Sequence, residues 1–324
     1  MKVLGIESSA HTFGAGIVDR GKVLANEKSM FPIGTNGMIP GKVAEFHSSN
    51  ALKVVKAALD RAGTKLSEIE GISYTSGPGL GPCLQIGQLI SKTLAKTLSI
   101  SIAPVNHCVA HIEITRHFAK MRDPLVLYVS GGNSQILKLS EEPFRHYSVL
   151  GETLDIGVGN MLDNLARRLG LNPAWGSSVA KAAERGKYIN MPYTVKGMDF
   201  SFTGILTFAE KMAGKELPED ICFSVQENAF AMLCEATERA MFLTDSAEIC
   251  VSGGVAQSRR LKEMLAQISR EHGARIGYVS DELNADNGAM VALVGEKMLE
   301  SGFKARLSDC VIDQKYRTDE AMVY

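Results

Sequence analysis

Two histidines four residues apart are the side chains in this sequence best suited to bind a metal. His107 and His111 lie in the stretch NHCVAHIE, residues 106–113. On a helix this spacing places both imidazoles on one face, and two imidazoles suit zinc or iron. The pair leaves the coordination shell incomplete, so at least one oxygen ligand must come from elsewhere in the chain. The alternative is a pair of partly buried histidines whose ring nitrogens are satisfied by hydrogen bonds.

Asp286 is the best candidate for the missing oxygen ligand. It lies in the stretch ADNGAM, residues 285–290, where we predict the start of a helix that runs to about residue 299. An aspartate in this position is often only a helix cap, and the sequence leaves both interpretations open.

Three small polar turns are the second group of residues that could do chemistry. They occupy residues 8–12, 130–134 and 252–254, each directly after an apolar run. Such turns expose several backbone N–H groups, which suit phosphate oxygens without side-chain charge. One turn alone is weak evidence, but three of them, two in a repeated strand, turn, strand pattern, predict a nucleotide cleft between two domains.

Two further polar features lie between the second and third turns. Asp163 is on a predicted helix around residues 160–169. It is either an exposed charge or a carboxylate that accepts hydrogen bonds from ribose hydroxyls. Residues 195–204, VKGMDFSFTG, place polar groups between aromatic residues and glycines. We predict an active-site loop there.

Strands and helices alternate along the chain, which predicts an α/β fold. The pattern of residues 3–18 returns at residues 125–139, and this repeat predicts an internal duplication. We therefore place a first domain at residues 1–124 and a second at 125–324, with the C-terminal segment as a candidate to return to the first domain. The predicted strands are 2–7, 13–19, 22–29, 71–75, 101–105, 125–129, 135–139 and 275–279; a loop is predicted at 30–41, and helices at 42–63, 84–98, 160–169 and 259–272.

The composition of the sequence predicts a cytoplasmic protein. The chain of 324 residues has no run of eighteen apolar residues, and Glu7 comes too early for a signal peptide, so we expect no membrane contact. The six cysteines show no CxxC spacing and predict buried reduced thiols without disulfides. A net charge of -1 means that any nucleic-acid surface is a local patch or is shared with a partner.

The order of these motifs resembles one family. The strings GIESSAHT, GPGLGP, NHCVAHIE, LYVSGGNSQIL, GETLDIGVGN, VKGMDFSFTG, VSGGVA and ADNGAM follow one another as in the universal tRNA threonylcarbamoyladenosine family, over almost the whole chain. The resemblance implies the actin-like ATPase fold, in which two duplicated α/β domains hold a nucleotide. It implies transfer of a threonylcarbamoyl group from threonylcarbamoyl-AMP to N6 of the adenosine beside the anticodon of ANN-decoding tRNAs. Archaeal and eukaryotic members act as the catalytic subunit of the KEOPS complex, with a small kinase and small accessory subunits.

The resemblance also implies a set of site residues. The metal, iron or zinc, would be held by His107, His111 and Asp286, with Tyr128 as a further oxygen donor. The metal would offset charge as the tRNA amine attacks, while backbone N–H groups stabilise the departing phosphate, and no side chain is assigned as a catalytic acid, base or nucleophile. The bound nucleotide, ATP or threonylcarbamoyl-AMP, would contact Tyr128, Val129, Ser130, Gly131, Gly132, Asp163, Gly176, Gly253, Gly254 and Ser258.

Three positions depart from the family pattern. Ala180 stands where a ribose-binding glutamate is usual, and Ser258 replaces a common asparagine. Residues 36–40 read NGMIP, where a GGIHP type is usual. These changes leave the metal ligands intact and predict a lowered affinity for the nucleotide.

Three other functions are alternatives to acyl transfer. A zinc peptidase of the HExxH type needs a glutamate directly after the first histidine, and that position is Cys108, so this function is excluded. A small-molecule kinase of the same fold would need a carboxylate base beside its acceptor hydroxyl and has no use for a histidine pair. A non-catalytic ATP-binding scaffold subunit is the third alternative, since the altered nucleotide residues could reflect lost turnover.

Overall fold

The computed structural model describes residues 1–32 and 38–324, and this part of the chain divides into two compact units. Unit 1 comprises Met1–His117, Ser140–Tyr147 and Ser280–Tyr324, and unit 2 comprises Phe118–Leu139 and Ser148–Val279. The chain first passes from unit 1 to unit 2 between His117 and Phe118, and the domains predicted at 1–124 and 125–324 stay a prediction. Residues 33–37, within the predicted loop at 30–41, lie outside the described part of the chain. They include Asn36 and Gly37 of the altered NGMIP stretch.

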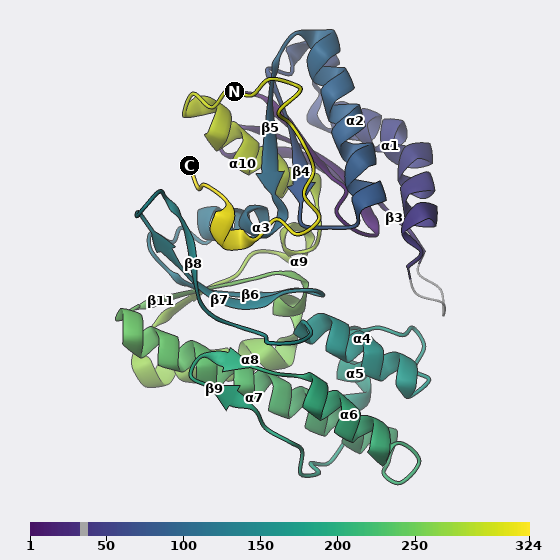
Figure 1. The fold of residues 1–324 in the computed structure, drawn as a ribbon, viewed down its shortest axis with the longest axis vertical. Helices are drawn as coiled ribbons and strands as arrows, with labels where there is room; N and C mark the ends of the chain where they lie inside the picture. Colours follow the sequence, from purple (N-terminus) through teal and green to yellow (C-terminus); the bar gives the residue numbers. More distant parts are fainter. Residues whose placement is uncertain (33–37) are drawn as a thin grey trace. The chain divides into compact units, whose positions relative to one another are not determined.

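Unit 1 is built on a five-stranded sheet in the order β3-β2-β1-β4-β5 (Figure 1). Strands β1 and β2 form an antiparallel hairpin, whereas β4 and β5 run parallel to β1. Every residue of β1 and β4 is buried because helices cover both faces of the sheet, as parallel strands require. The strands span β1 Val3–Glu7, β2 Thr12–Asp19, β3 Lys22–Met30, β4 Gly71–Gly77 and β5 Ser101–Asn106.

The helices of unit 1 are α1 Pro40–Ala62, α2 Gly81–Leu98, α3 His107–Phe118, α9 Asp281–Asn284 and α10 Gly288–Glu300, with short 3₁₀ turns η1 Leu66–Glu68 and η3 Thr318–Glu320. Helices α1 and α2 lie on one side of the sheet and α10 on the other (Figure 1). Helix α10 approaches the strands closely, because a Cβ on Gly5 would lie 2.2 Å from the backbone nitrogen of Ala292. The residues just before α10 are thereby fixed to the sheet.

Unit 2 repeats this topology. Its sheet has the order β12-β11-β6-β7-β8, with β6 and β7 antiparallel and β11 and β12 parallel to β6. Read from the opposite edge, this is the order of unit 1, so the predicted duplication is confirmed. The strands span β6 Leu125–Val129, β7 Ser134–Ser140, β8 His146–Glu152, β11 Glu248–Ser252 and β12 Arg275–Gly277, the last ending before the predicted 279.

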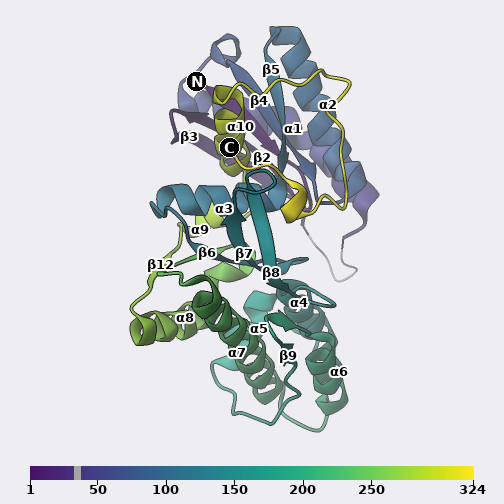
Figure 2. The same ribbon diagram turned by 60° about the vertical axis from the view of Figure 1, so that its left-hand side comes forward.

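The helices of unit 2 share one hydrophobic core, and Figure 2 shows α4 to α8 grouped together. They are α4 Val158–Arg168, α5 Gly176–Ala183, α6 Thr203–Met212, α7 Pro218–Thr244 and α8 Arg259–His272, with the hairpin β9 Val195–Lys196 and β10 Asp199–Phe200 and the 3₁₀ turn η2 Gly254–Gln257. Helix α7 was not predicted from the sequence. Its buried residues include Gln226, Asn228 and Thr237, so polar residues interrupt the apolar face by which a surface helix is recognised.

All six cysteines are buried, as the sequence predicted. Within residues 1–32 and 38–324, no helix combines the length and the hydropathy needed to cross a bilayer.

Candidate metal centre and nucleotide turns

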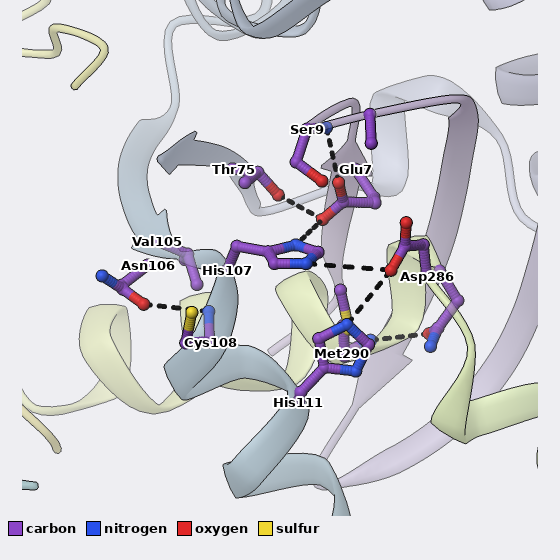
Figure 3. A network of polar contacts seen from close by, with 12 residues as sticks. Glu7, Ser9, Thr75, Val105, Asn106, His107, Cys108, His111, Asp286 and Met290 are labelled. Atoms are coloured by element: carbon purple, nitrogen blue, oxygen red, sulfur yellow. Dashed lines mark hydrogen bonds and ion pairs between the residues drawn. The ribbon is translucent and has the colours of Figure 1, made fainter. Parts of the chain in front are cut away.

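His107, His111 and Asp286 converge in unit 1 (Figure 3). The Nε2 atom of His111 lies 3.2 Å from Oδ1 of Asp286, and the Nε2 atom of His107 lies 3.7 Å from the same oxygen. One nitrogen from each histidine and one carboxylate oxygen all lie within 4.8 Å of one another. Two imidazoles and a carboxylate at this spacing form a donor set that suits zinc or iron.

Two helix starts position these ligands. Helix α3 begins at His107, directly after β5, so His107 and His111 project from one face one turn apart. Asn287, and not Asp286, caps α10, because its side-chain oxygen accepts a hydrogen bond from the backbone N–H of Met290 at 3.0 Å. The capping interpretation of Asp286 is therefore wrong, and its carboxylate faces the histidines instead.

Glu7 contacts Nδ1 of His107, the ring nitrogen that does not face Asp286 (Figure 3). Its buried carboxylate accepts hydrogen bonds from the hydroxyl of Thr75 at 2.6 Å and from the backbone N–H of Ser9 at 2.6 Å, and Oε2 lies 3.0 Å from Nδ1 of His107. A proton on Nδ1 leaves the Nε2 lone pair directed at Asp286, which is how a carboxylate orients a metal-ligating histidine. Sequence reasoning missed Glu7, although a carboxylate at the end of a buried strand was a usable signal.

The charges in this cluster favour a cation. Burial opposes the charged form of His107, but the carboxylates of Glu7 and Asp286 outweigh it and raise the pKa of His107 to about 10. Burial lowers the pKa of His111. For Asp286, burial alone would raise the pKa, yet hydrogen bonding to His111 and the charge of His107 lower it. Two carboxylates therefore face one charged imidazole, and a divalent metal bound in place of the Nε2 proton would balance them.

The second glycine turn lies in unit 2, between β6 and β7. Tyr128, fully buried, and Val129 end β6, and the backbone N–H of Ser130 bonds to the carbonyl of Asn133 at 2.8 Å. The start of α4 packs against Gly131 and Gly132, because a Cβ on Gly157 would lie 2.4 Å from the Gly131 carbonyl oxygen. The turn is thus held by a helix N-terminus.

The third turn packs against the end of β6. Gly253 has a φ of +95°, and a Cβ there would lie 2.4 Å from the carbonyl oxygen of Val129, so glycine is required on both counts. Gly254 follows as the first residue of η2. The hydroxyl of Ser258 caps α8 by accepting from the N–H of Leu261 at 3.4 Å, so its observed partner is a helix end.

Asp163 and Gly176 form a second cluster in unit 2. Oδ1 of Asp163, on α4, accepts a hydrogen bond from the backbone N–H of Gly176 at 2.7 Å. Asp163 lies one helical turn beyond Asn160, whose N–H bonds to the carbonyl of Gly131 at 2.9 Å. Helix α4 therefore connects the Asp163 cluster to the second turn, and the interpretation of Asp163 as only an exposed charge is wrong.

The comparisons with known proteins assign the chain to a family. Residues 21–293 match the family model described as tRNA N6-adenosine threonylcarbamoyltransferase. The enzyme of that name from Danio rerio is 45% identical over 99% of this chain and 98% of its own length, and that from Thermococcus sibiricus is 44% identical over 100% and 99%. The chain belongs to the tRNA N6-adenosine threonylcarbamoyltransferase family. It is therefore an acyltransferase that modifies N6 of an adenosine in tRNA.

A relative from Thermoplasma volcanium is longer than the other two. It is described as a probable bifunctional tRNA threonylcarbamoyladenosine biosynthesis protein, is 43% identical, and is matched over 99% of this chain but 60% of its own length. The rest of that relative's length lies outside the match.

Solved structures confirm the actin-like α/β fold. HypF from T. kodakarensis superimposes with a TM-score of 0.65 at 15% identity, over 93% of this chain and 48% of that one. A glucokinase of the ROK family from Streptomyces griseus, in complex with glucose and AMPPNP, gives 0.51 at 14% identity, over 92% and 100%. At these identities the likeness establishes the fold alone.

Residues 195–204 of this transferase, predicted to be an active-site loop, are held in place by Asp155. Phe200 and Phe202 are core residues, and the segment closes on Asp155. The Asp155 carboxylate accepts from the backbone N–H groups of Phe202 at 3.0 Å and Thr203 at 2.8 Å, and also from the hydroxyl of Ser201. Sequence reasoning gave Asp155 no role. The catalytic role of the loop stays a prediction.

Proposed function

We propose that the protein transfers the threonylcarbamoyl group from threonylcarbamoyl-AMP to N6 of the adenosine beside the anticodon of ANN-decoding tRNAs, using a metal held by His107, His111 and Asp286. The observation that carries this proposal is the convergence of the three ligand atoms within 4.8 Å, in a partly buried site that holds two carboxylates. The donor set suits zinc or iron.

The bound metal would supply Lewis-acid stabilisation of the negative charge that develops on the donor oxygens during transfer. Residues of the chain itself orient the metal ligands. Glu7 orients His107 through Nδ1, and the cap at Asn287 leaves the Asp286 carboxylate directed at the two imidazoles. The attacking amine comes from the tRNA, so the site needs no side-chain nucleophile.

The nucleotide half of the donor, or ATP, would bind the turns of unit 2. The backbone N–H groups of residues 130–132 and of Gly253 and Gly254 would bind phosphate oxygens, with Asp163, Gly176 and Ser258 completing the contacts. AMPPNP is bound in the glucokinase of the same fold, which supports this proposal. Tyr128 as an additional metal ligand rests on the family resemblance, and Tyr128 belongs to unit 2.

We further propose that the chain works in the cytoplasm as the catalytic subunit of a KEOPS-type complex with a small kinase and small accessory subunits. The longer relative is described as bifunctional, and the part of it outside the match belongs to the same chain. This supports a stable association between the transferase and a partner protein. The net charge of -1 is compatible with a tRNA surface that is a local patch or is shared with partner subunits.

The histidine pair offers a direct test. His111→Ala removes one ligand, and we expect loss of bound metal and of tRNA modification, with the fold left intact. His117→Ala is the matched control, because His117 lies on the same helix, is exposed and bonds through Nε2 to the carbonyl of Gly21. Both variants are assayed for metal content and for threonylcarbamoyl-adenosine in tRNA, with the partner subunits present. Full activity of His111→Ala would refute the metal's role.

The alternatives predict different results in the same assays. A small-molecule kinase would phosphorylate a sugar in a substrate screen, and a scaffold would bind ATP without ever modifying tRNA. The transferase relatives, matched over nearly their whole length, favour acyl transfer over both.

A further inference from the structure

We propose that Asn106 is a positioning residue through which the C-terminal segment Asp313–Arg317, here called the strap, holds the start of the histidine helix α3 in place. This inference rests on the proposed metal site, because its consequence is a change in metal affinity. All of the residues involved belong to unit 1.

The side-chain oxygen of Asn106 caps α3. The first N–H groups of a helix have no partner within the helix, and Oδ1 accepts from those of Cys108 at 2.9 Å and Val109 at 3.1 Å (Figure 3). The first turn held in this way contains His107, and His111 lies one turn further on. The cap therefore sets the direction in which α3 leaves β5, and with it the position of both imidazoles.

The side-chain nitrogen of Asn106 bonds to the strap. Nδ2 donates to the carbonyl of Tyr316 at 3.2 Å and to that of Arg317 at 3.1 Å, and the residue is 4% exposed. The amide has one favourable orientation, because turning it over would oppose its nitrogen to two N–H groups and its oxygen to two carbonyls. Asn106 thus links the N-terminus of α3 to the strap through four hydrogen bonds.

The strap has its own attachments to the fold. The N–H of Asp313 donates to the carbonyl of Ser76 at 2.8 Å. Gln314 accepts through its backbone oxygen from the N–H of Gly79 at 3.3 Å and through its side-chain Oε1 from the N–H of Gly81 at 3.2 Å. In both views the yellow C-terminal segment runs beside α2 and reaches α3 (Figures 1 and 2). The strap is therefore a fixed support for Asn106.

The glycine turn at residues 77–81 is shaped to receive the strap. Gly77 has a φ of +155°, and a Cβ there would lie 1.7 Å from the carbonyl oxygen of Asp313. A Cβ on Gly81 would lie 2.6 Å from the side chain of Gln314. The GPGLGP motif makes none of the proposed metal or nucleotide contacts. Its role is to contact the strap.

A double-mutant cycle tests the proposal. Asn106→Ala removes both the cap and the link, and Gln314→Ala loosens the strap without altering Asn106. Zinc affinity is measured by competition with a chromophoric chelator on the full chain, well below the unfolding midpoint. We expect Asn106→Ala to bind zinc about tenfold more weakly, in the range found when a residue supporting a metal ligand is removed. Gln314→Ala should weaken binding in the wild-type background and have no added effect in the Asn106→Ala background.

The outcomes separate this inference from the metal site itself. The tail control is Asp309→Asn, which breaks an exposed ion pair with Arg306 outside the strap and should leave zinc affinity unchanged. Wild-type zinc binding by Asn106→Ala, or additive effects of the two substitutions, would overturn the role of Asn106. Wild-type zinc binding by His111→Ala would instead overturn the proposed site. If Asn106→Ala fails to fold, wild-type binding by Gln314→Ala refutes the proposal by itself.

Discussion

Nζ of Lys297, on α10, lies 2.6 Å from Oε2 of Glu113, on α3. Glu113 is 1% exposed, and Oε1 also accepts from Arg116 at 2.9 Å and from the hydroxyl of Tyr147 at 2.5 Å. Helix α3 carries the two histidines, and α10 follows Asp286. The ion pair, buried on its Glu113 side, therefore joins the two helices on which the proposed metal ligands depend.

Loss of the ion pair between Lys297 and Glu113 should destabilise unit 1. Lys297→Met removes one charged partner of Glu113 and keeps Arg116 and Tyr147 in place. We expect the free energy of unfolding to fall by about 2 kcal/mol, the contribution of a hydrogen bond to a charged group. Urea unfolding measures it, with the exposed Lys304→Met as the matched control. Equal unfolding midpoints for Lys297→Met and the control would show that the pair contributes nothing.

The carboxylate behind His107 should control metal affinity. Glu7→Gln keeps an acceptor for Nδ1 but removes the charge that makes His107 a better ligand, so we expect zinc to bind about 10 to 100 times more weakly. Chelator competition measures the dissociation constant, and Glu45→Gln, an exposed position on α1, is the control. An unchanged dissociation constant for Glu7→Gln would limit Glu7 to a packing role.

Low pH should reduce the contribution of Asp155 to the free energy of unfolding. Desolvation by itself would raise the pKa of Asp155, but hydrogen bonds from Ser201 and from the N–H groups of Phe202 and Thr203 lower it. A carboxyl whose folded pKa is depressed adds stability above its unfolded pKa, near 3.9, and loses that stability as the pH falls. Asp155→Asn should therefore be less stable than wild type at pH 7, and the difference should narrow toward about pH 3. A constant difference in urea midpoints across this range would contradict the assignment.

The parts of the site that the sequence predicted depend on residue type and local spacing. His107 and His111 share one face of a helix in any fold. Asp286 lies at the predicted start of the last long helix, two residues before Gly288. The duplicated topology followed from the repeated strand, turn, strand pattern, and Gly63 does end α1 in a left-handed conformation.

The contacts that were missed join residues distant in sequence. Glu7 meets His107 because β1 and β5 flank β4 in one sheet, and Asn106 meets the strap across 210 residues or more. Strand order and the path of a polar tail have no local signature. The place of Glu7 at the end of a buried strand was a signal for that residue, but its pairing with His107 and the contact of Asn106 with the strap could not be read from spacing. Helix α7 was missed because a helix buried on most sides lacks an amphipathic pattern.

Ala180 offers a gain-of-affinity prediction for the nucleotide. It lies on α5, the helix that begins at Gly176, at the position where the family resemblance implies a ribose-binding glutamate. Ala180→Glu should raise ATP affinity about tenfold, since a carboxylate that accepts from ribose hydroxyls contributes roughly 1.5 kcal/mol. Isothermal titration measures it, with Lys181→Glu, an exposed neighbour on the same helix, as the control for added negative charge. Equal ATP affinities for wild type and Ala180→Glu would place the ribose away from α5, whereas a gain confined to Ala180→Glu would locate it beside Gly176 and Asp163.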